Sequence, residues 1–335
     1  MTFQVDIQPS GQKFALEADK TILDGALADG LMLKHSCREG TCGSCKCKVA
    51  SGSVDHADSP LEVLSEAERA EGMVLTCRAR ATSDLVIDAP EVGELRGICV
   101  QETAARVGAI DKVSDDVAVV RLMLPPSGPE FRYYPGQYID VQLKDGTRRS
   151  YSMATSVPVD NQLELHIRHM PGGKFSGHVF EAMKPREMVR VSGPYGSFYL
   201  RDSERPMVFL ASGTGFAPIK ALLEQLREQG ANTRPVHLYW GGRRRKDLYQ
   251  HNELLAMAAE LSWLEYIPVL SEPSNECDWQ GATGFVHLQV LADFVSLENF
   301  EVYACGAPVM VDSARRDFVA QRQLAEERFF ADAFV

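Results

Sequence analysis

The sequence predicts a multidomain protein of mixed α+β and α/β class, because three regions of the chain differ in the pattern of their apolar residues. The chain has 335 residues, enough for two or three domains that each bury a core. Short strands and helices mix in the first region, strand follows strand in the second, and strands alternate with helices in the third. We expect the domains to span residues 1–95, 100–202 and 206–335.

The composition is that of an ordinary globular protein, with 45% hydrophobic and 24% charged residues. The net charge is −11, and no basic stripe accompanies aromatic residues, so we expect no nucleic-acid partner. No apolar run approaches the roughly 18 residues of a membrane span, and the amino terminus lacks a signal pattern. Cys47, Cys99, Cys277 and Cys305 show no pairing pattern. These features predict a protein of the reducing cytoplasm.

The first region begins with residues 3–7 and 13–17, which alternate apolar with polar residues around Pro9 and Gly11 and so predict a β-hairpin. Thr21 can cap a short helix that begins at Ile22. The other elements expected here are a strand at 46–49, a helix from Ser65, a strand at 74–77 and a strand at 84–89.

A cysteine-rich loop follows the first helix. Cys37, Cys42 and Cys45 are spaced C-x4-C-x2-C and are followed by the distant Cys77, which is the plant-type ligand set for a [2Fe–2S] cluster. Each tetrahedral iron of such a cluster takes two bridging sulfides and two protein sulfurs. The alternatives are a zinc site or buried thiols. Zinc sites favour paired C-x2-C segments, and only one such pair is present.

The second and third regions differ in period. Strands expected at 117–124, 138–143, 163–168 and 188–191, with little helix between them, predict an antiparallel barrel. From Met207 onward, strands and helices alternate, which predicts a doubly wound parallel sheet. The expected strands are 207–210, 236–240, 264–270 and 301–305, and the expected helices are 219–227, 248–261, 288–294 and 309–323.

Residues 1–95, with this cysteine motif, resemble a plant-type ferredoxin of the β-grasp fold. The rest of the chain resembles a flavoprotein of the ferredoxin–NADP-reductase type. The whole chain resembles the three-domain NAD(P)H-dependent reductases. The resemblance implies a β-grasp ferredoxin domain, an antiparallel β-barrel flavin domain and a doubly wound nucleotide domain. It also implies that electrons pass from NAD(P)H to FAD, then to the cluster, and then to a partner enzyme.

Arg149-Ser150-Tyr151-Ser152 matches the R-x-Y-S element of that family. An arginine fork suits the FAD pyrophosphate, a tyrosine ring can lie on the isoalloxazine, and the resemblance places Ser152 at the flavin edge where hydride arrives. About twenty residues later, Gly173, Lys174 and Ser176 open a helix and form a candidate anion cradle. The strand between these two motifs carries the further candidate flavin contacts His166 and Arg168, and a lone histidine is more often structural than catalytic.

Gly213, Thr214 and Gly215 follow an apolar strand and open a helix, which lets the backbone approach a pyrophosphate. They match the family's G-T-G-x-A-P element rather than the generic G-x-G-x-x-G pattern.

Cys305 and Gly306 resemble the family's C-G-x-P element, which touches the nicotinamide. The resemblance implies that Cys305 helps to orient the nicotinamide and does not act as a nucleophile.

Two further residues concern the nucleotide. By resemblance, Phe334 in the aromatic tail covers the flavin until nicotinamide displaces it. Arg243 lies in the loop that recognises the adenosine ribose, where it can bind a 2′-phosphate or simply face solvent. The resemblance favours NADH, with NADPH the alternative.

The acceptor is left open between an oxygenase component and the sugar dehydrase served by CDP-6-deoxy-3,4-glucoseen reductases. Two other functions compete with partner reduction. One is a free flavin or small-acceptor reductase, which the four intact ligand cysteines disfavour. The other is a redox-sensing module, which the intact nicotinamide loop disfavours.

Overall fold

The computed structural model describes residues 1–335 except positions 90–91, 96, 159–160, 231, 275–277 and 335. Cys277 therefore lies outside the described residues. The chain packs as two compact units, one of residues 1–101 with 193–197 and the other of residues 102–192 with 198–334. Among the described residues, none of the helices has the length and apolarity needed to cross a bilayer.

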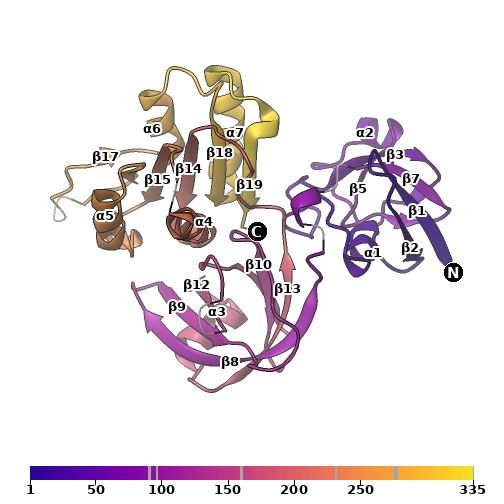
Figure 1. Cartoon of the computed structure of the whole chain (residues 1–335), viewed down its shortest axis with the longest axis horizontal. Coiled ribbons are helices and arrows are strands. Elements are labelled where there is room, and N and C mark those ends of the chain that lie inside the picture. The colour runs from indigo at the N-terminus through magenta and orange to yellow at the C-terminus, as the bar shows by residue number, and fades with distance from the viewer. Residues whose placement is uncertain (90–91, 96, 159–160, 231, 275–277, 335) are drawn as a thin grey trace. The chain divides into compact units, whose positions relative to one another are not determined.

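The first unit is built on a five-stranded sheet in the order β2-β1-β7-β3-β5 (Figure 1). The predicted hairpin is confirmed, since β1 and β2 pair antiparallel, and Thr21 Oγ1 caps the first helix by accepting from Asp24 N–H. Ser65 and Glu68 form a capping box on the second helix. The elements are β1 (Thr2–Gln8), β2 (Lys13–Glu17), α1 (Ile22–Ala28), β3 (Lys46–Ser51), β4 (Val54–Asp55), α2 (Glu66–Ala70), β5 (Met73–Leu75), β6 (Arg80–Ala81) and β7 (Leu85–Asp88).

The second unit begins with the predicted antiparallel sheet, in the order β11-β10-β13-β8-β9-β12. A bridge between Met153 and Leu165 links the region just after β11 to β12 and so nearly closes the barrel. The sequence prediction missed β8, because few of its residues are buried and it lacks a clear run of apolar residues. The elements are β8 (Gln101–Lys112), β9 (Val117–Met123), β10 (Tyr138–Gln142), β11 (Arg148–Ser152), β12 (Gln162–Arg168), α3 (Lys174–Glu181) and β13 (Met188–Tyr195).

The same unit continues into the predicted parallel sheet, in the order β17-β16-β15-β14-β18-β19. Phe209 and Ala211 on β14 pack with α4 and α5, while Val208 and Leu210 pack with α6 and α7, so helices cover both faces (Figure 1). The main elements are β14 (Met207–Ser212), α4 (Phe216–Gln229), β15 (Val236–Gly242), α5 (His251–Glu260), β16 (Leu264–Leu270), β17 (Ala282–Thr283), α6 (Val286–Asp293), β18 (Glu301–Gly306), α7 (Pro308–Arg322) and β19 (Phe329–Ala333).

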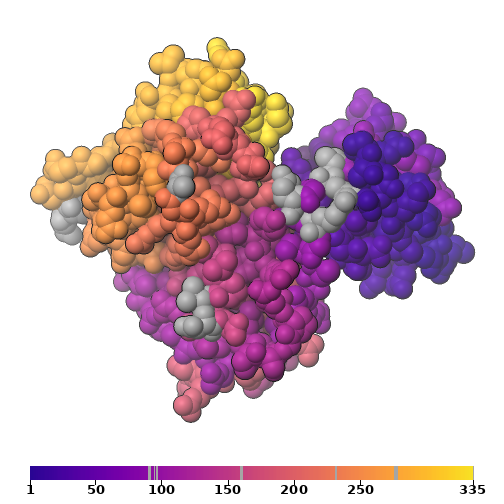
Figure 2. Space-filling view, viewed as in Figure 1, coloured from indigo at the N-terminus to yellow at the C-terminus, as the bar shows by residue number. Residues whose placement is uncertain are grey.

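Within this unit the barrel and the parallel sheet are in direct contact, and their surfaces adjoin on the face drawn in Figure 2. The contact brings β11 and β12 to the carboxyl ends of the parallel strands. Those ends are where ligands bind in open α/β sheets.

Candidate functional site

The loop from Ser36 to Cys45 connects α1 to β3 and carries three of the predicted cluster ligands. Gly40 has a φ of +80°, a conformation that glycine adopts at little cost. A Cβ at this position would lie 3.0 Å from Cγ of Arg78. The loop can therefore curl back on itself only because glycine stands at this position.

The four predicted ligand thiols lie as two pairs. Cys45 Sγ and Cys77 Sγ are 3.3 Å apart, and the thiols of Cys37 and Cys42 hydrogen-bond to each other. The bond from Cys42 lowers the pKa of Cys37, and the bond from Cys77 lowers the pKa of Cys45. Thr76 N–H donates to Cys45 O at 3.2 Å, which holds the distant fourth ligand beside the third.

Two pairs of thiols fit a two-iron cluster, in which each iron takes two protein sulfurs. A single zinc ion would need ligands that converge on one point. The two thiol pairs therefore fit the iron–sulfur interpretation.

The R-x-Y-S segment forms β11 and places its side chains in different surroundings. Tyr151 is half-buried, with its ring 5.2 Å from that of Phe175 at 41°, and burial raises the pKa of its hydroxyl. Arg149 is exposed, so its guanidinium can reach an anion. Ser152 is buried and faces the parallel sheet rather than solvent.

The amino end of α3 is the second part of the predicted flavin site. Gly173 is its N-cap and makes no side-chain capping bond, so the first amides of the helix are open to a ligand. Lys174 is exposed beside them. Ser176 is buried, and its Oγ accepts from Met170 N–H at 3.0 Å, so this hydroxyl serves the loop. The open amides, Lys174 and Arg149 offer the hydrogen-bond donors and the positive charge that the FAD pyrophosphate requires.

Arg168 lies where the barrel meets the parallel sheet. Its Nε donates to Asp116 Oδ2 at 2.9 Å, and a Cβ on Gly213 would lie 3.3 Å from its Nη1. The structure thus places a residue predicted for the flavin beside a glycine predicted for the nucleotide. β12 is the last strand in the sheet order, and its outer edge pairs around Leu165 with the residues that follow β11, through the bridge to Met153.

The turn from Gly213 to Gly215 joins β14 to α4 and packs against the end of β18. A Cβ on Gly215 would lie 2.3 Å from Cys305 O, so only glycine allows this close approach. Ala307 N–H donates to Ser212 Oγ at 3.2 Å and ties the two strand ends together. The turn therefore presents backbone, not side chain, at the carboxyl edge of the sheet.

Three predicted or neighbouring side chains meet at that edge. Ser152 Oγ donates to Asp332 Oδ2 at 3.2 Å, and Asp332 stands opposite Cys305 in the parallel pairing of β18 with β19. Cys305 is fully buried, and this burial raises the pKa of its thiol well above the usual value. The thiol is therefore neutral near pH 7 and suits an orienting role. Phe334 N–H donates to Gly306 O at 3.0 Å, which extends the pairing beyond β19.

The sequence reasoning assigned no strand to the aromatic tail and no role to Asp332. The tail instead forms β19, and its period of two was the available signal. That period places Phe330, Asp332 and Phe334 on one face of the strand.

The loop after β15 holds the predicted residue Arg243. The backbone N–H groups of Arg243 and Arg244 both donate to Asp247 Oδ2 at 2.9 Å, so Asp247 shapes the loop. Glu272 N–H donates to Arg243 O at 2.8 Å, which brings this exposed glutamate next to the loop. The sequence reasoning looked for a carboxylate only at the end of β15 and missed the one that follows β16.

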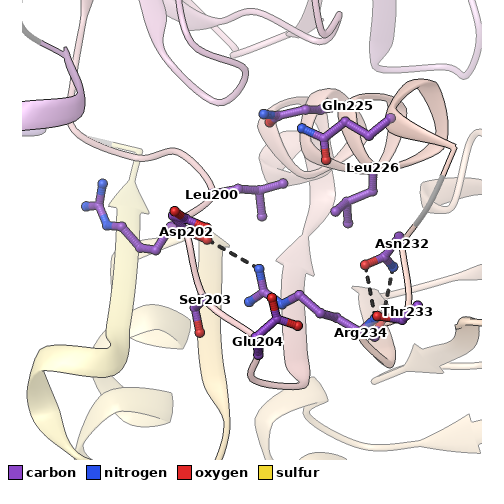
Figure 3. Close-up of a pocket in the computed structure, with 11 residues that line it drawn as sticks. Leu200, Asp202, Ser203, Glu204, Gln225, Leu226, Asn232, Thr233 and Arg234 are labelled. Atoms are coloured by element: carbon purple, nitrogen blue, oxygen red, sulfur yellow. Dashed lines mark hydrogen bonds between the residues drawn. The ribbon is translucent and has the colours of Figure 1, made fainter.

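A cavity of about 430 Å³ opens at the opposite edge of the sheet (Figure 3). Arg234 crosses its wall, with Nη2 bonded to Glu301 Oε2 at 2.7 Å and Nε bonded to Arg205 O at 2.7 Å. The residues that line it precede β14 and β15, so it lies at the amino ends of the strands. Dinucleotides bind at the carboxyl ends, and this cavity is therefore not the nucleotide site.

Three family descriptions match the chain. The description "2Fe-2S iron-sulfur cluster binding domain" matches residues 5–82, "Oxidoreductase FAD-binding domain" matches residues 104–199, and "Oxidoreductase NAD-binding domain" matches residues 209–316. The matches follow the order of the cluster loop, the barrel and the parallel sheet.

Whole-chain relatives were found as well. The chain is 40% identical over 337 residues to the CDP-6-deoxy-L-threo-D-glycero-4-hexulose-3-dehydrase reductase of Yersinia pseudotuberculosis, covering 100% of this chain and 99% of the relative. It is 35% identical over 335 residues to the xylene/toluene monooxygenase electron transfer component XylA of Pseudomonas putida, covering 98% and 93%. Among solved structures, the Amycolatopsis cytochrome P450 reductase GcoB superposes with a TM-score of 0.85 at 31% identity, covering 99% of each chain.

The fold and the three sites define an oxidoreductase with binding domains for NAD, FAD and a [2Fe–2S] cluster. The chain belongs to the family of iron–sulfur flavoprotein reductases that includes these reductase components. The predicted fold class, the cofactors and the electron-transfer activity are thereby confirmed.

Proposed function

We propose that this chain takes electrons from NADH and delivers them, through FAD and then the cluster, to a sugar dehydrase acting on a CDP-linked deoxyhexulose. The observation that carries the choice of partner is whole-length identity. The dehydrase reductase of Yersinia pseudotuberculosis is 40% identical, against 35% for the phenol hydroxylase P5 protein of Acinetobacter pittii and for XylA. An oxygenase component is the second candidate, because the latter two relatives serve oxygenases by name.

The residues at the barrel–sheet junction have separable roles in this proposal. When bound, FAD takes up two electrons as hydride and releases them singly, and a [2Fe–2S] cluster carries one at a time. Asp332 Oδ2 accepts the hydrogen bond from the Ser152 hydroxyl and so fixes the direction of that hydroxyl. The backbone carbonyl of Cys305 packs against Gly215, and the buried, neutral thiol of the same residue would limit where a nicotinamide ring can lie.

The preference for NADH rests on Glu272. A carboxylate can accept a hydrogen bond from a ribose 2′-hydroxyl and repels a 2′-phosphate. Glu272 stands beside the loop of Arg243, and Asp247 already occupies the backbone amides of that loop. We therefore assign Glu272, together with Arg243, to the adenosine ribose.

The test is reconstitution with purified partners. The full chain, loaded with FAD and cluster, is mixed anaerobically with NADH and either a pyridoxamine-dependent CDP-hexulose dehydrase or a diiron hydroxylase. We expect NADH-driven turnover of the dehydrase at a kcat/KM at least about tenfold above that with the hydroxylase. A higher kcat/KM with the hydroxylase than with the dehydrase would mean that the partner is an oxygenase component instead. Turnover with neither partner, alongside rapid reduction of free flavin, would favour the free flavin reductase.

The domain limits and the location complete the proposal. We place the boundaries near residues 95–100 and 202–206, where limited proteolysis should cleave first. A cytoplasmic location follows from the need for NADH, and cell fractionation checks it.

A further inference from the structure

A buried polar chain crosses from the barrel to the nucleotide domain. Glu164 and His166 lie on one face of β12, since they are two residues apart. Glu164 Oε1 is 3.2 Å from Lys220 Nζ on α4 and 3.1 Å from His166 Nε2. His166 Nδ1 is 2.7 Å from the hydroxyl of Tyr249, which follows the ribose loop. Two segments of the nucleotide domain, α4 and the segment that carries Tyr249, are thereby linked to one strand of the barrel.

The direction of these hydrogen bonds follows from charge. Burial opposes ionisation of Glu164, but the hydrogen bond with His166 and the charge of Lys220 outweigh it and lower its pKa to about 2. Burial lowers the pKa of His166, so the ring is neutral. An ionised carboxylate only accepts, so Nε2–H donates to Glu164 and Nδ1 must accept from the Tyr249 hydroxyl.

The ring of Tyr249 supports the glycine turn indirectly, through Trp240. It stands edge-on to Trp240, with centroids 5.1 Å apart at 89°, and Trp240 stacks on Phe216 at 4.2 Å. Trp240 Nε1 donates to Gly213 O at 3.0 Å. Phe216 follows the turn directly, and it lies 6.4 Å from the ring of His166. The ring of Tyr249 therefore contacts Trp240, which holds the glycine turn, while its hydroxyl bonds to His166 on the barrel.

We propose that His166 and Tyr249 are a pair of positioning residues that fix the glycine turn against the flavin strand and so set how nicotinamide meets the flavin. The pair acts through the backbone elements it joins, not by contact with a reacting atom. The inference deepens the proposed function, because it rests on electron flow from NADH to FAD. It also gives His166 a role different from direct flavin contact.

The proposal predicts energetic coupling between the two nucleotide ligands. If the pair joins their sites, NAD⁺ must change the affinity of the apoprotein for FAD, and FAD must change that for NAD⁺ by the same factor. Tyr249→Phe removes only the hydroxyl and keeps the ring on Trp240. Tyr239→Phe is a matched control, since the Tyr239 hydroxyl bonds Asp293 on the other face of the same sheet.

The experiment measures FAD affinity by flavin fluorescence with and without NAD⁺, and flavin reduction at saturating NADH by stopped flow. Tyr249→Phe should abolish the NAD⁺ effect on FAD affinity and slow reduction about tenfold, while leaving FAD affinity itself within about twofold. The double variant with His166→Leu should be no slower than His166→Leu alone. Tyr239→Phe should match the unmodified protein in both measurements.

Three results would overturn the proposal: no NAD⁺ effect on FAD affinity in the unmodified chain, normal coupling in Tyr249→Phe, or equal losses in both tyrosine variants. A failure of the proposed function is distinguishable, because the identity of the partner does not enter these measurements, and a chain that does not take electrons from NADH would show no flavin reduction in the unmodified protein or in Tyr239→Phe.

Discussion

The cluster loop and the barrel–sheet junction are built in opposite ways. Three of the four ligand thiols come from the nine residues between Cys37 and Cys45, and backbone curvature alone brings them together. The junction instead draws Ser152, Cys305 and Asp332 from three different strands, with 180 residues between Ser152 and Asp332. A local site tolerates changes elsewhere, whereas a site assembled from distant strands depends on every contact that fixes those strands.

The largest expected effect tests the local site. Cys42→Ser removes one thiol of a pair, so the cluster cannot be held with two sulfurs on each iron. We expect NADH-driven reduction of cytochrome c to fall at least about 100-fold, because the electrons can no longer pass through the cluster. Reduction of ferricyanide by the flavin should persist. Both are followed by absorbance.

Cys99→Ser is the matched control, since Cys99 is exposed and outside the ligand set, and it should leave both rates unchanged. Undiminished cytochrome c reduction in a folded, cluster-free Cys42→Ser protein would mean that electrons leave by another route.

The same contrast explains what the sequence could predict. The spacing of the cysteines predicted the cluster ligands, and the period of the apolar residues predicted the four inner strands and the helices of the parallel sheet, but not its edge strands β17 and β19. Contacts between segments far apart in the chain bring Asp332 to Ser152 and Glu272 to Arg243, and the spacing of residues along the chain does not reveal such contacts. β8 was missed because a barrel strand with one face in solvent buries few residues.

The second prediction tests the tightest contact of the junction. Gly215→Ala forces a Cβ to within 2.3 Å of Cys305 O, so the backbone of the turn must move. We expect flavin reduction by NADH to slow about 100-fold, in line with the cost of misplacing a substrate by about 1 Å. Stopped-flow absorbance at the flavin band measures it.

Gly177→Ala is the control, because nothing lies within 4 Å of a Cβ there. Cluster reduction by dithionite should be normal in both variants. An unchanged reduction rate in Gly215→Ala would show that the close approach does not position the nucleotide.

The third prediction concerns Asp332. Asp332→Ala frees the Ser152 hydroxyl to rotate, because its acceptor is lost. We expect the rate of flavin reduction to fall about tenfold, and Asp332→Asn, which keeps an acceptor oxygen, to retain most of the rate. Equal losses in both variants would assign the effect to charge rather than to orientation.

The fourth prediction is smaller, since Glu272 is exposed and its interactions are screened. Glu272→Gln should raise kcat/KM for NADPH relative to NADH by about fivefold, the size of about 1 kcal/mol. Steady-state rates with both nucleotides measure the ratio. Glu265→Gln, on β16 but paired with His237, is the control and should leave the ratio alone. A ratio that moves equally in both variants would mean that only the net charge matters.

The smallest effect on electron flow is expected at the amino ends of the parallel strands, which lie at the opposite edge of the sheet from the proposed cofactor sites. Arg234 and Glu301 pair there with side chains only 10% and 6% exposed, and Tyr303 OH also donates to Glu301 at 3.0 Å. Arg234→Met leaves the carboxylate buried without its cation and should lower the free energy of unfolding by about 3–5 kcal/mol. Adding Glu301→Gln should recover a large part of that loss, because the uncompensated charge is gone. Chemical denaturation measures both variants, and kcat/KM for NADH in the folded fraction should stay within about twofold. A rate that fell with stability would show that the two edges of the sheet are not independent, and the junction would then depend on the whole domain rather than on its own contacts.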